Sequence, residues 1–387
     1  MSYEDRIFGR NSEKISRAKT HITDERESIG GGMSGNERSR SEQTESELSA
    51  GFEALLTKLK HQPEDLHERI LRLKSLPDAD HILEKLGSLL TEEHWEMLAT
   101  LEAYDQQTFD HSLRVSSFVY DMASGDGQTA AYLRAQTERE QGSLQDLMFA
   151  ALFHDIGKTA IPREILHDNH SRREWGRRAN EWAAERNEPE YFDPTKLASL
   201  DEVELDDYFF RIHALEKTNP LNIVPIEKFF DPVVLKELEQ HGISAHDTFR
   251  KVLEYHQRAT KAILRRRKMY VVSDIASHHH DYEDRPIRYE RYPSEISALR
   301  LGFELSILRS MDVYDALTSS DRAYKNPYHP LLALEILIRE AEIEFTEPTL
   351  TKYVIHDLYH KLDAPHKHPS NENEVRAQKK ILAFIEN

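Results

Sequence analysis

The side chains best suited to chemistry in this sequence are histidines and aspartates that recur beside apolar segments. The most compact example is His154-Asp155, which follows the apolar run 147–152. A neutral imidazole supplies a nitrogen ligand, and a carboxylate supplies two oxygens that can bridge two cations. Lys158, four residues after His154, can direct a positive charge at a phosphate held by those cations. A histidine-aspartate pair that is simply buried in a helical core is the alternative interpretation.

The same residue types recur along the chain, close to the ends or inner faces of five predicted helices. The candidate ligands are His111, His154, Asp155, His256, His279, His280 and Asp312. Imidazole and carboxylate ligands without sulfur suit iron, manganese or zinc, and this many ligands exceed the needs of one ion. Two neighbouring cations can hold a hydroxide and stabilise a phosphodiester during in-line displacement. The pattern therefore favours a two-metal hydrolytic site.

Each candidate ligand also has a structural interpretation. His111 and His256 can be capping or core histidines, and the run 278–280 can be a solvated surface segment. Asp312 can be a charge on a helix surface, although Met311 and Val313 beside it are apolar. The pattern alone leaves these roles and the metal site as competing hypotheses.

The composition limits the class of protein. The length of 387 residues exceeds a typical single domain, and 39% hydrophobic residues suit a soluble globular protein with polar extensions. A net charge of −18 argues against general nucleic-acid binding but leaves room for a small basic pocket for a phosphorylated ligand. The absence of cysteine excludes disulfides, zinc–thiolate sites and thiol nucleophiles. Without a membrane-spanning apolar run or a secretory signal, we expect a cytoplasmic protein that does not bind membranes.

Helical periodicity dominates the elements that must position these residues, so we expect an all-α fold. The expected parts are a disordered or weakly ordered tail (1–50), an N-terminal helical unit (51–100), a metal-binding domain (101–365) and a polar, frayed C-terminal tail (366–387). Expected helices include 80–90, one starting at Thr91, one continuing through Met122, 330–344 and 348–362. The charged, proline-broken residues 168–240 are interpreted as an insertion.

Three local predictions concern the surroundings of the site. His154 and Asp155 should end a helix, with Gly157 in the left-handed geometry that terminates helices. Residues 244–247 should cap the start of the helix that carries His256. Four aromatic residues should anchor the insertion on the bundle because aromatic side chains bury the most area. They are Trp175, Trp182, Phe209 and Phe210.

In chain order, these segments resemble the HD superfamily of metal-dependent phosphohydrolases, and more narrowly its HD-GYP branch of cyclic-dinucleotide phosphodiesterases. The similar segments are 111–115 (HSLRV), 154–165 (HDIGKTAIPREI), 255–264, 279–281 (HHD) and 312–319 (DVYDALTS). The resemblance implies a helical bundle and metal ligation by all seven candidates, with Asp155 bridging two divalent ions, iron or manganese first and zinc as the alternative. It also implies that Lys158 holds substrate phosphate. The implied reaction is hydrolysis of a cyclic dinucleotide such as cyclic di-GMP by hydroxide held on the metals.

The sequence departs from the HD-GYP pattern at its Gly-Tyr-Pro motif, where residues 291–293 read Arg-Tyr-Pro. Glycine permits backbone geometry that arginine disfavours. We expect replacement phosphate contacts from this loop, from Arg285, Arg288, Arg291 and Tyr292. A solvated loop is the alternative for the arginines. Two other functions stay open: a non-catalytic, metal-containing binding or regulatory module, and a phosphohydrolase for another nucleotide. A homodimer is also compatible with the sequence.

Overall fold

The computed structural model describes most of the chain, in two units, Met1–Ser46 and Glu47–Asn387. The described residues are 35–75, 82–140, 144–167, 171–201, 204–205, 208–209, 223–240, 243–280, 298–320, 327–342 and 346–386. The second unit contains all seven candidate metal ligands and the helices that carry them.

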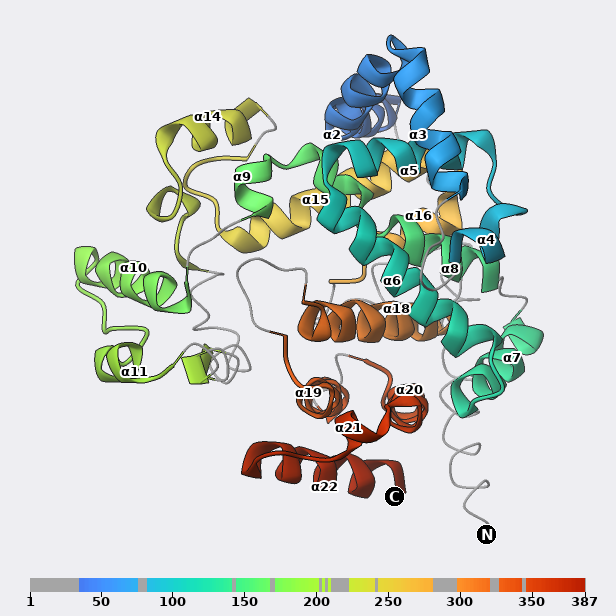
Figure 1. The fold of residues 1–387 in the computed structure, drawn as a ribbon. Coiled ribbons are helices and arrows are strands. Elements are labelled where there is room, and N and C mark those ends of the chain that lie inside the picture. Colours follow the sequence, from blue (N-terminus) through green and yellow to red (C-terminus); the bar gives the residue numbers. More distant parts are fainter. Residues whose placement is uncertain are drawn as a thin grey trace. The chain divides into compact units, whose positions relative to one another are not determined.

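The regular structure of the described residues is helical. Their one β-type pairing is an isolated bridge between Pro225 and Thr248. The all-α prediction is therefore confirmed (Figure 1). Within the described ranges, no helix combines the length and the apolar character that crossing a bilayer requires.

The first helices of the described chain are α2 (Gly35–Lys60), α3 (Pro63–Ser75), α4 (Ile82–Gly87) and α5 (Glu92–Tyr104). The start of α5 follows the sequence prediction, since Thr91 and His94 form a reciprocal cap. The Thr91 backbone N–H donates to His94 Nδ1 at 3.0 Å, and the His94 backbone N–H donates to the Thr91 hydroxyl at 3.4 Å. Such a cap satisfies backbone donors that a helix start leaves unpaired.

The centre of the fold is formed by α6 (Gln106–Ser124), α8 (Leu144–Phe153), α15 (Phe249–Arg266), α16 (Tyr270–Ala276) and α18 (Ala298–Thr318). Helix α7 (Gln128–Glu140) and the short 3-10 helix η1 (Ile156–Ala160) complete it. Helix α6 packs against α8 and α18, while α15 packs against η1 and α16. Phe109 of α6 and Phe153 of α8 are fully buried in the shared core. This packing brings helices from distant parts of the chain to one place.

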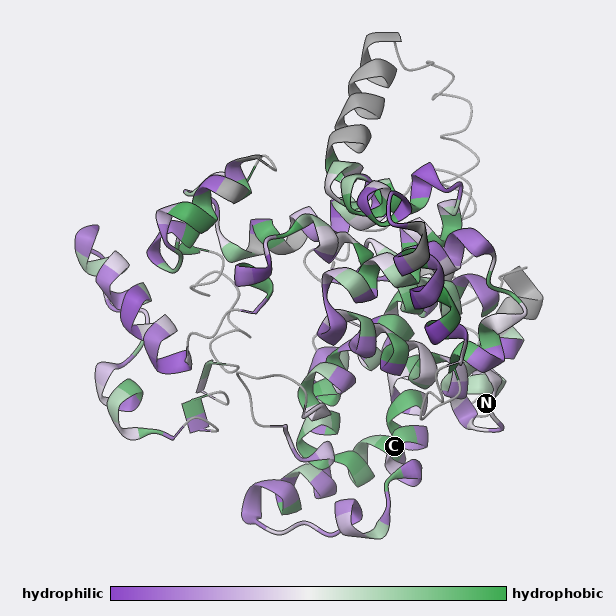
Figure 2. Ribbon diagram, turned by 45° about the horizontal axis from the view of Figure 1, so that its top comes forward, coloured by the Kyte–Doolittle hydropathy of each residue, from purple (hydrophilic) through white to green (hydrophobic). Residues whose placement is uncertain are grey.

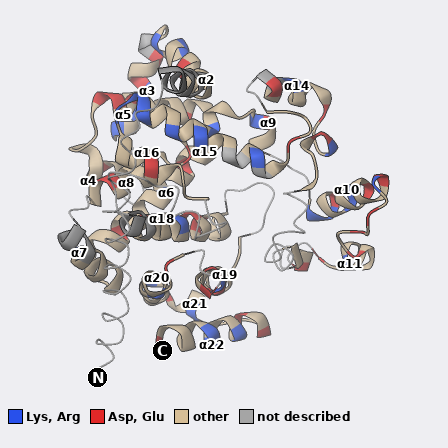
Figure 3. Cartoon of the chain, turned by 180° about the vertical axis from the view of Figure 1, so that it is seen from behind, with Lys and Arg blue, Asp and Glu red and all other residues tan. Residues whose placement is uncertain are grey.

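Basic residues in and just after α15 form ion pairs with the neighbouring helices α16 and α2. Figure 3 shows lysine and arginine along α15. Lys261 Nζ and Arg265 Nη2 lie 3.3 Å and 3.1 Å from Asp274 Oδ1 of α16. Arg267, just after the helix, has a side chain that is 6% exposed, and its Nη1 lies 2.9 Å from Glu53 Oε1 of α2. Exposed ion pairs contribute little stability, so this more shielded contact is the stronger restraint. Together they fix the helix that carries His256.

The C-terminal helices are α19 (Pro330–Glu342), α20 (Pro348–Lys361), α21 (Ala364–Lys367) and α22 (Glu372–Glu386). The first two agree with the predicted segments. The frayed tail predicted for residues 366–387 is wrong, because α22 packs on α19. Ala377 and Ile381, four residues apart, are fully buried there. One apolar stripe is enough to dock an otherwise polar helix.

The insertion contains α10 (Arg172–Glu185), α11 (Pro194–Ser199), the 3-10 helix η3 (Ile226–Lys228) and α14 (Pro232–Gln240), and it follows α9 (Arg163–Leu166). Helix α10 is largely hydrophilic in Figure 2. Its apolar residues enter a separate cluster within the insertion. The buried members of this cluster are Trp175, Ala179, Phe192, Leu197, Leu205, Val224 and Phe229.

The predicted role of the four aromatic anchors is only partly correct. Trp175 stacks on Phe229 at 3.7 Å between ring centroids and reaches Phe249, the first residue of α15, at 4.6 Å. Phe209 instead stacks on Phe192 inside the insertion, at 4.2 Å. Trp182 lies under Lys228 at 4.9 Å, and Phe210 lies outside the described residues. The insertion thus has its own aromatic core, because its aromatic residues contact one another as well as α15.

The start of α15 also differs from the sequence prediction. Residues 244–247 form a separate turn, in which the Ser244 backbone N–H donates to Asp247 Oδ2 at 2.9 Å. Thr248 is the N-cap residue, and its side chain makes no capping hydrogen bond. The serine-aspartate pair closes its own loop before the helix begins, which is a common alternative to capping.

Candidate metal centre

His154 and Asp155 lie in the turn between α8, which ends at Phe153, and η1. Their predicted position at the end of a helix is confirmed. Both are buried, with 0% and 1% of their surfaces exposed. His154 Nδ1 donates to the Ala151 carbonyl oxygen at 2.8 Å. Since a carbonyl can only accept, Nδ1 carries a proton, and Nε2 is the ring nitrogen that can ligate a metal ion.

Gly157 is required for close packing, and it does not adopt the left-handed conformation that we predicted. A Cβ atom at this position would lie 2.0 Å from the His256 carbonyl oxygen and 2.5 Å from the Thr260 backbone nitrogen. The Gly157 N–H donates to the Thr260 hydroxyl at 3.0 Å, and this hydroxyl donates to the His154 carbonyl oxygen at 3.1 Å. The absence of a side chain therefore lets α15 approach the His154-Asp155 turn.

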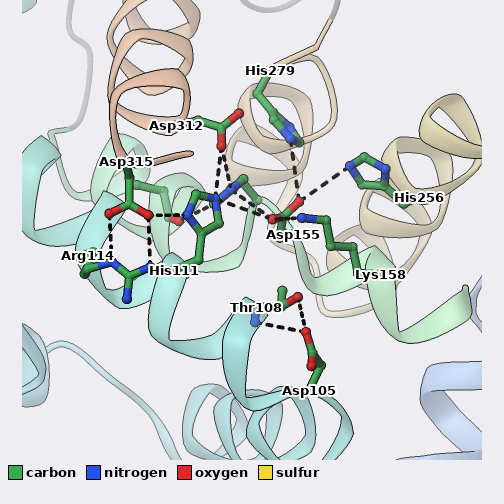
Figure 4. Close-up of polar contacts among 12 residues, drawn as sticks. Asp105, Thr108, His111, Arg114, Asp155, Lys158, His256, His279, Asp312 and Asp315 are labelled. Carbon is green, nitrogen blue, oxygen red and sulfur yellow. Dashed lines mark hydrogen bonds and ion pairs between the residues drawn. The ribbon is translucent and has the colours of Figure 1, made fainter. Parts of the chain in front are cut away.

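The seven predicted ligands come from five segments of the chain and meet around the Asp155 carboxylate. Figure 4 labels five of them: His111, Asp155, His256, His279 and Asp312. His111 lies on α6, His256 on α15 and Asp312 on α18, while His279 and His280 follow α16. Six of the seven are buried, and His280 is half-buried. Histidine and aspartate side chains so far from solvent need partners that satisfy them.

The two oxygens of Asp155 face different histidines. Oδ2 lies 3.3 Å from His154 Nε2 and 3.7 Å from His111 Nε2. Oδ1 lies 3.5 Å from His256 Nε2 and 3.8 Å from His279 Nε2. A carboxylate arranged in this way can ligate a different cation with each oxygen.

Among the described residues, three overlapping groups could hold metal ions, and within each group the ligand atoms all lie within 4.8 Å of one another. They are Asp155-His256-His279-His280, His111-His154-Asp155 and His154-His279-Asp312. Asp155 belongs to the first two groups. The structure therefore places all of the predicted ligands in one cluster, whose residue types suit iron, manganese or zinc.

Unsatisfied buried atoms test whether this cluster fits a cation. Among the described residues, His154 Nε2, Asp155 Oδ1, His279 Nε2 and both ring nitrogens of His256 make no hydrogen bond. A buried polar atom without a partner costs about 1–3 kcal/mol. The Nε2 atoms of His154, His256 and His279 lie 3.3, 3.5 and 3.8 Å from the Asp155 oxygens, where a coordinated cation would satisfy several of these atoms together. The residues present fit a divalent metal.

Burial keeps three of the histidines neutral, which is the form that binds metals. Burial lowers the pKa of His256 to about 3 and that of His279 to about 4, and it holds the pKa of His280 well below its usual value. His154 behaves differently. Burial lowers its pKa, but attraction to Asp155 and Asp312 outweighs burial, so that its pKa is raised. The carboxylates that attract a proton to His154 would also attract a cation.

The carboxylates are ionised despite their burial. Burial raises the pKa of Asp155, but Lys158 and His154 outweigh this effect, and the pKa lies well below its usual value. Lys158 Nζ donates to Asp155 Oδ2 at 2.5 Å. Burial also raises the pKa of Asp312, but a hydrogen bond with His111 and attraction to His111, His154 and His280 together outweigh it, so this pKa is also well below the usual value. The centre thus carries negative charge that divalent ions would neutralise.

Two further residues of the site were not singled out by the sequence analysis. Asp315 Oδ2 lies 2.6 Å from His111 Nδ1, and Arg114 donates to both Asp315 oxygens, from Nε at 2.7 Å and from Nη2 at 3.1 Å. Their spacing in the sequence could have identified them, since Arg114 follows His111 by three residues and Asp315 follows Asp312 by three. Residues three apart share a helix face.

The predicted phosphate-binding residues Arg285, Arg288, Arg291 and Tyr292 lie outside the described residues. Their role stays a prediction. Lys158, the other predicted phosphate contact, lies at the centre, with 21% of its side chain exposed.

Comparison with known families finds a match that covers part of the candidate site. The model of the HD domain matches residues 108–202, a segment that contains His111, His154 and Asp155. This match supports an HD-superfamily, metal-dependent phosphohydrolase and implies divalent metal binding. His256, His279, His280 and Asp312 lie beyond the matched segment. No curated protein and no solved structure gives a significant match to the chain.

Proposed function

We propose that this protein is a two-metal phosphodiesterase that hydrolyses a cyclic dinucleotide such as cyclic di-GMP. The observation that carries the proposal is that the two oxygens of Asp155 face different histidines. Oδ2 faces His111 and His154, and Oδ1 faces His256 and His279. Bound divalent ions would lower the pKa of water and neutralise charge on a phosphodiester. The order of the ligand segments in the sequence supports the HD-GYP type of this chemistry.

The chain's own residues have distinct roles in this proposal. His111, His154 and Asp312 would hold one ion with Asp155, and His256, His279 and His280 would hold the other. Lys158 keeps Asp155 ionised and carries a positive charge beside it. When Asp155 ligates the ions, the Lys158 ammonium is available for a phosphate oxygen, where a fixed positive charge stabilises the transition state.

Product analysis tests the substrate. The purified protein, supplied with Mn²⁺ or Fe²⁺, is incubated with cyclic di-GMP, with other cyclic dinucleotides and with linear dinucleotides. We expect ring opening of a cyclic dinucleotide by the parent and loss of turnover in Asp155→Asn. Turnover of another phosphorylated nucleotide alone would favour an HD phosphohydrolase of different specificity. Binding of cyclic di-GMP in calorimetry, without turnover of any substrate, would favour a binding module.

A further inference from the structure

We propose that Asp315 and Arg114 are positioning residues that make one half of the metal centre bind its ion more tightly than the other. The first half-site is defined as His111, His154, Asp155 and Asp312, and the second as Asp155, His256, His279 and His280. The inference rests on the metal centre of the proposed function and is independent of the substrate.

Asp315 fixes the protonation of His111. Its Oδ2 lies 2.6 Å from His111 Nδ1, and an ionised carboxylate can only accept, so Nδ1 carries a proton. Nε2 is thereby left as the ligand nitrogen. It lies 3.0 Å from Asp312 Oδ1 and 3.7 Å from Asp155 Oδ2, where a bound cation would take the place of a proton shared with Asp312. Carboxylates that bind the far nitrogen of a ligand histidine in this way orient the ring and increase its basicity.

Arg114 fixes the orientation of Asp315 in turn. It donates from Nε to Oδ1 at 2.7 Å and from Nη2 to Oδ2 at 3.1 Å, a two-pronged contact that holds the carboxylate plane. Asp315 is 2% exposed, so little water competes for its oxygens. His111 and Arg114 belong to α6, and Asp312 and Asp315 belong to α18. The contact therefore joins the two helices at the level of the ligands.

The second half-site has weaker support of this kind. In the described part of the chain, neither ring nitrogen of His256 makes a hydrogen bond. His279 is oriented by the Ala276 carbonyl oxygen, 2.5 Å from its Nδ1, a neutral acceptor instead of a carboxylate. The negative charge also differs, since the first half-site contains Asp155 and Asp312 whereas the second contains Asp155 alone. Both differences favour tighter binding in the first half-site.

The test compares metal affinities in Asp315→Asn, Arg114→Gln and a matched control. Asparagine has the shape of aspartate, but its amide can donate to His111 Nδ1 and shift the ring proton to Nε2, the atom that a cation needs. Glu102→Gln is the control. Glu102 is a buried carboxylate that pairs with Arg69 at 3.0 Å and with Arg72, so its substitution removes a comparable ion pair that involves no ligand histidine.

Chelator-treated proteins are titrated with Mn²⁺, and free Mn²⁺ is followed by electron paramagnetic resonance. The parent should show a tight and a weaker class of bound ion. Asp315→Asn should weaken the tight class by about 10–100-fold and leave the weaker class unchanged. Arg114→Gln should act in the same direction with a smaller change, and Glu102→Gln should leave both classes as in the parent.

Several results would overturn the inference: equal affinities for the two ions in the parent, an unchanged tight class in Asp315→Asn, or equal weakening of both classes with a lower melting temperature. The last result would assign a purely structural role. Failure of the proposed function is distinguishable, because a parent that binds both classes of Mn²⁺ but hydrolyses no cyclic dinucleotide would remove the substrate and leave the positioning role intact.

Discussion

The backbone N–H of Gly157 donates to the hydroxyl of Thr260 at 3.0 Å, across 103 residues of chain. The same hydroxyl donates to the carbonyl oxygen of His154 at 3.1 Å. One threonine therefore links the turn that carries His154 and Asp155 to the helix that carries His256. The two halves of the candidate metal centre are therefore joined by the Thr260 hydrogen bonds as well as through Asp155.

Gly157→Ala should damage this link. The new Cβ would lie 2.0 Å from the His256 carbonyl oxygen, a backbone atom that cannot rotate away. We expect a loss of about 1–3 kcal/mol in the free energy of unfolding, as for other overpacked sites, together with reduced metal content. Gly87→Ala is the control, because a Cβ there meets nothing within 4 Å. Urea denaturation measures both variants, and equal stabilities would contradict the packing role of Gly157.

Lys158→Met should separate catalysis from metal binding. The ammonium contacts Asp155 but is not a candidate metal ligand, so the variant should keep its ions while the hydrolysis rate falls by about 10²–10³-fold. Lys251→Met is a suitable control, because Lys251 is an exposed lysine of α15 that pairs with Asp247. Steady-state rates and metal content are measured on the same preparations. Unchanged turnover in Lys158→Met would remove its role toward phosphate.

The metal-free protein should lose stability as the pH falls below about 6.5. Burial lowers the pKa of His256 to about 3 and that of His279 to about 4. In the unfolded chain both rings regain an ordinary pKa, so the unfolded state binds more protons in this pH range. The free energy of unfolding then falls by about 1.4 kcal/mol per pH unit for each such histidine.

The contribution of one histidine is isolated by comparing how steeply the free energy of unfolding depends on pH in two proteins. The pKa of His154 is raised, so that this residue contributes with the opposite sign, and the difference between two proteins is more informative than one curve. Urea denaturation of the chelator-treated parent and of His256→Asn between pH 5 and pH 7 should give a shallower dependence in the variant. The same slope in both proteins would show that His256 does not titrate as its burial requires.

Trp175→Ala should loosen the insertion without emptying the metal centre. The indole stacks on Phe229 at 3.7 Å and contacts Phe249 at 4.6 Å. Its truncation should lower the free energy of unfolding by about 3–5 kcal/mol. The insertion should unfold first, because the cluster around Trp175 is separate from the main core. Limited proteolysis should cut within residues 171–201 sooner, with metal content unchanged. Trp182→Ala, a partly buried neighbour, should have a smaller effect, and equal sensitivity of the two variants would contradict this assignment.

Local patterns in the sequence predicted the local features of the structure. The start of α5 at Thr91 and the bounds of α19 and α20 follow from capping residues and helical periodicity, which act over a few residues. Glycine at position 157 was misinterpreted because glycine is used both for unusual backbone angles and for close packing. The sequence cannot distinguish the two uses without knowledge of what packs against the residue.

The contacts that span the chain could not be predicted in this way. The pairing of His111 with Asp315 joins residues 204 positions apart, and it depends on how α6 and α18 pack. The docking of α22 on α19 likewise depends on a surface that the tail's own polar composition does not reveal. The ligand residues were identifiable because their types and order carried information, whereas their supporting contacts depend on tertiary packing.

Metal content tests most directly whether Asp155 joins two divalent ions. The parent and Asp155→Asn are purified without chelator and analysed for iron, manganese and zinc per protein chain. We expect close to two equivalents in the parent and a clear loss in the variant, with a helical circular dichroism spectrum retained. A parent with no bound divalent metal, or an Asp155→Asn protein with the full content of the parent, would contradict the claim.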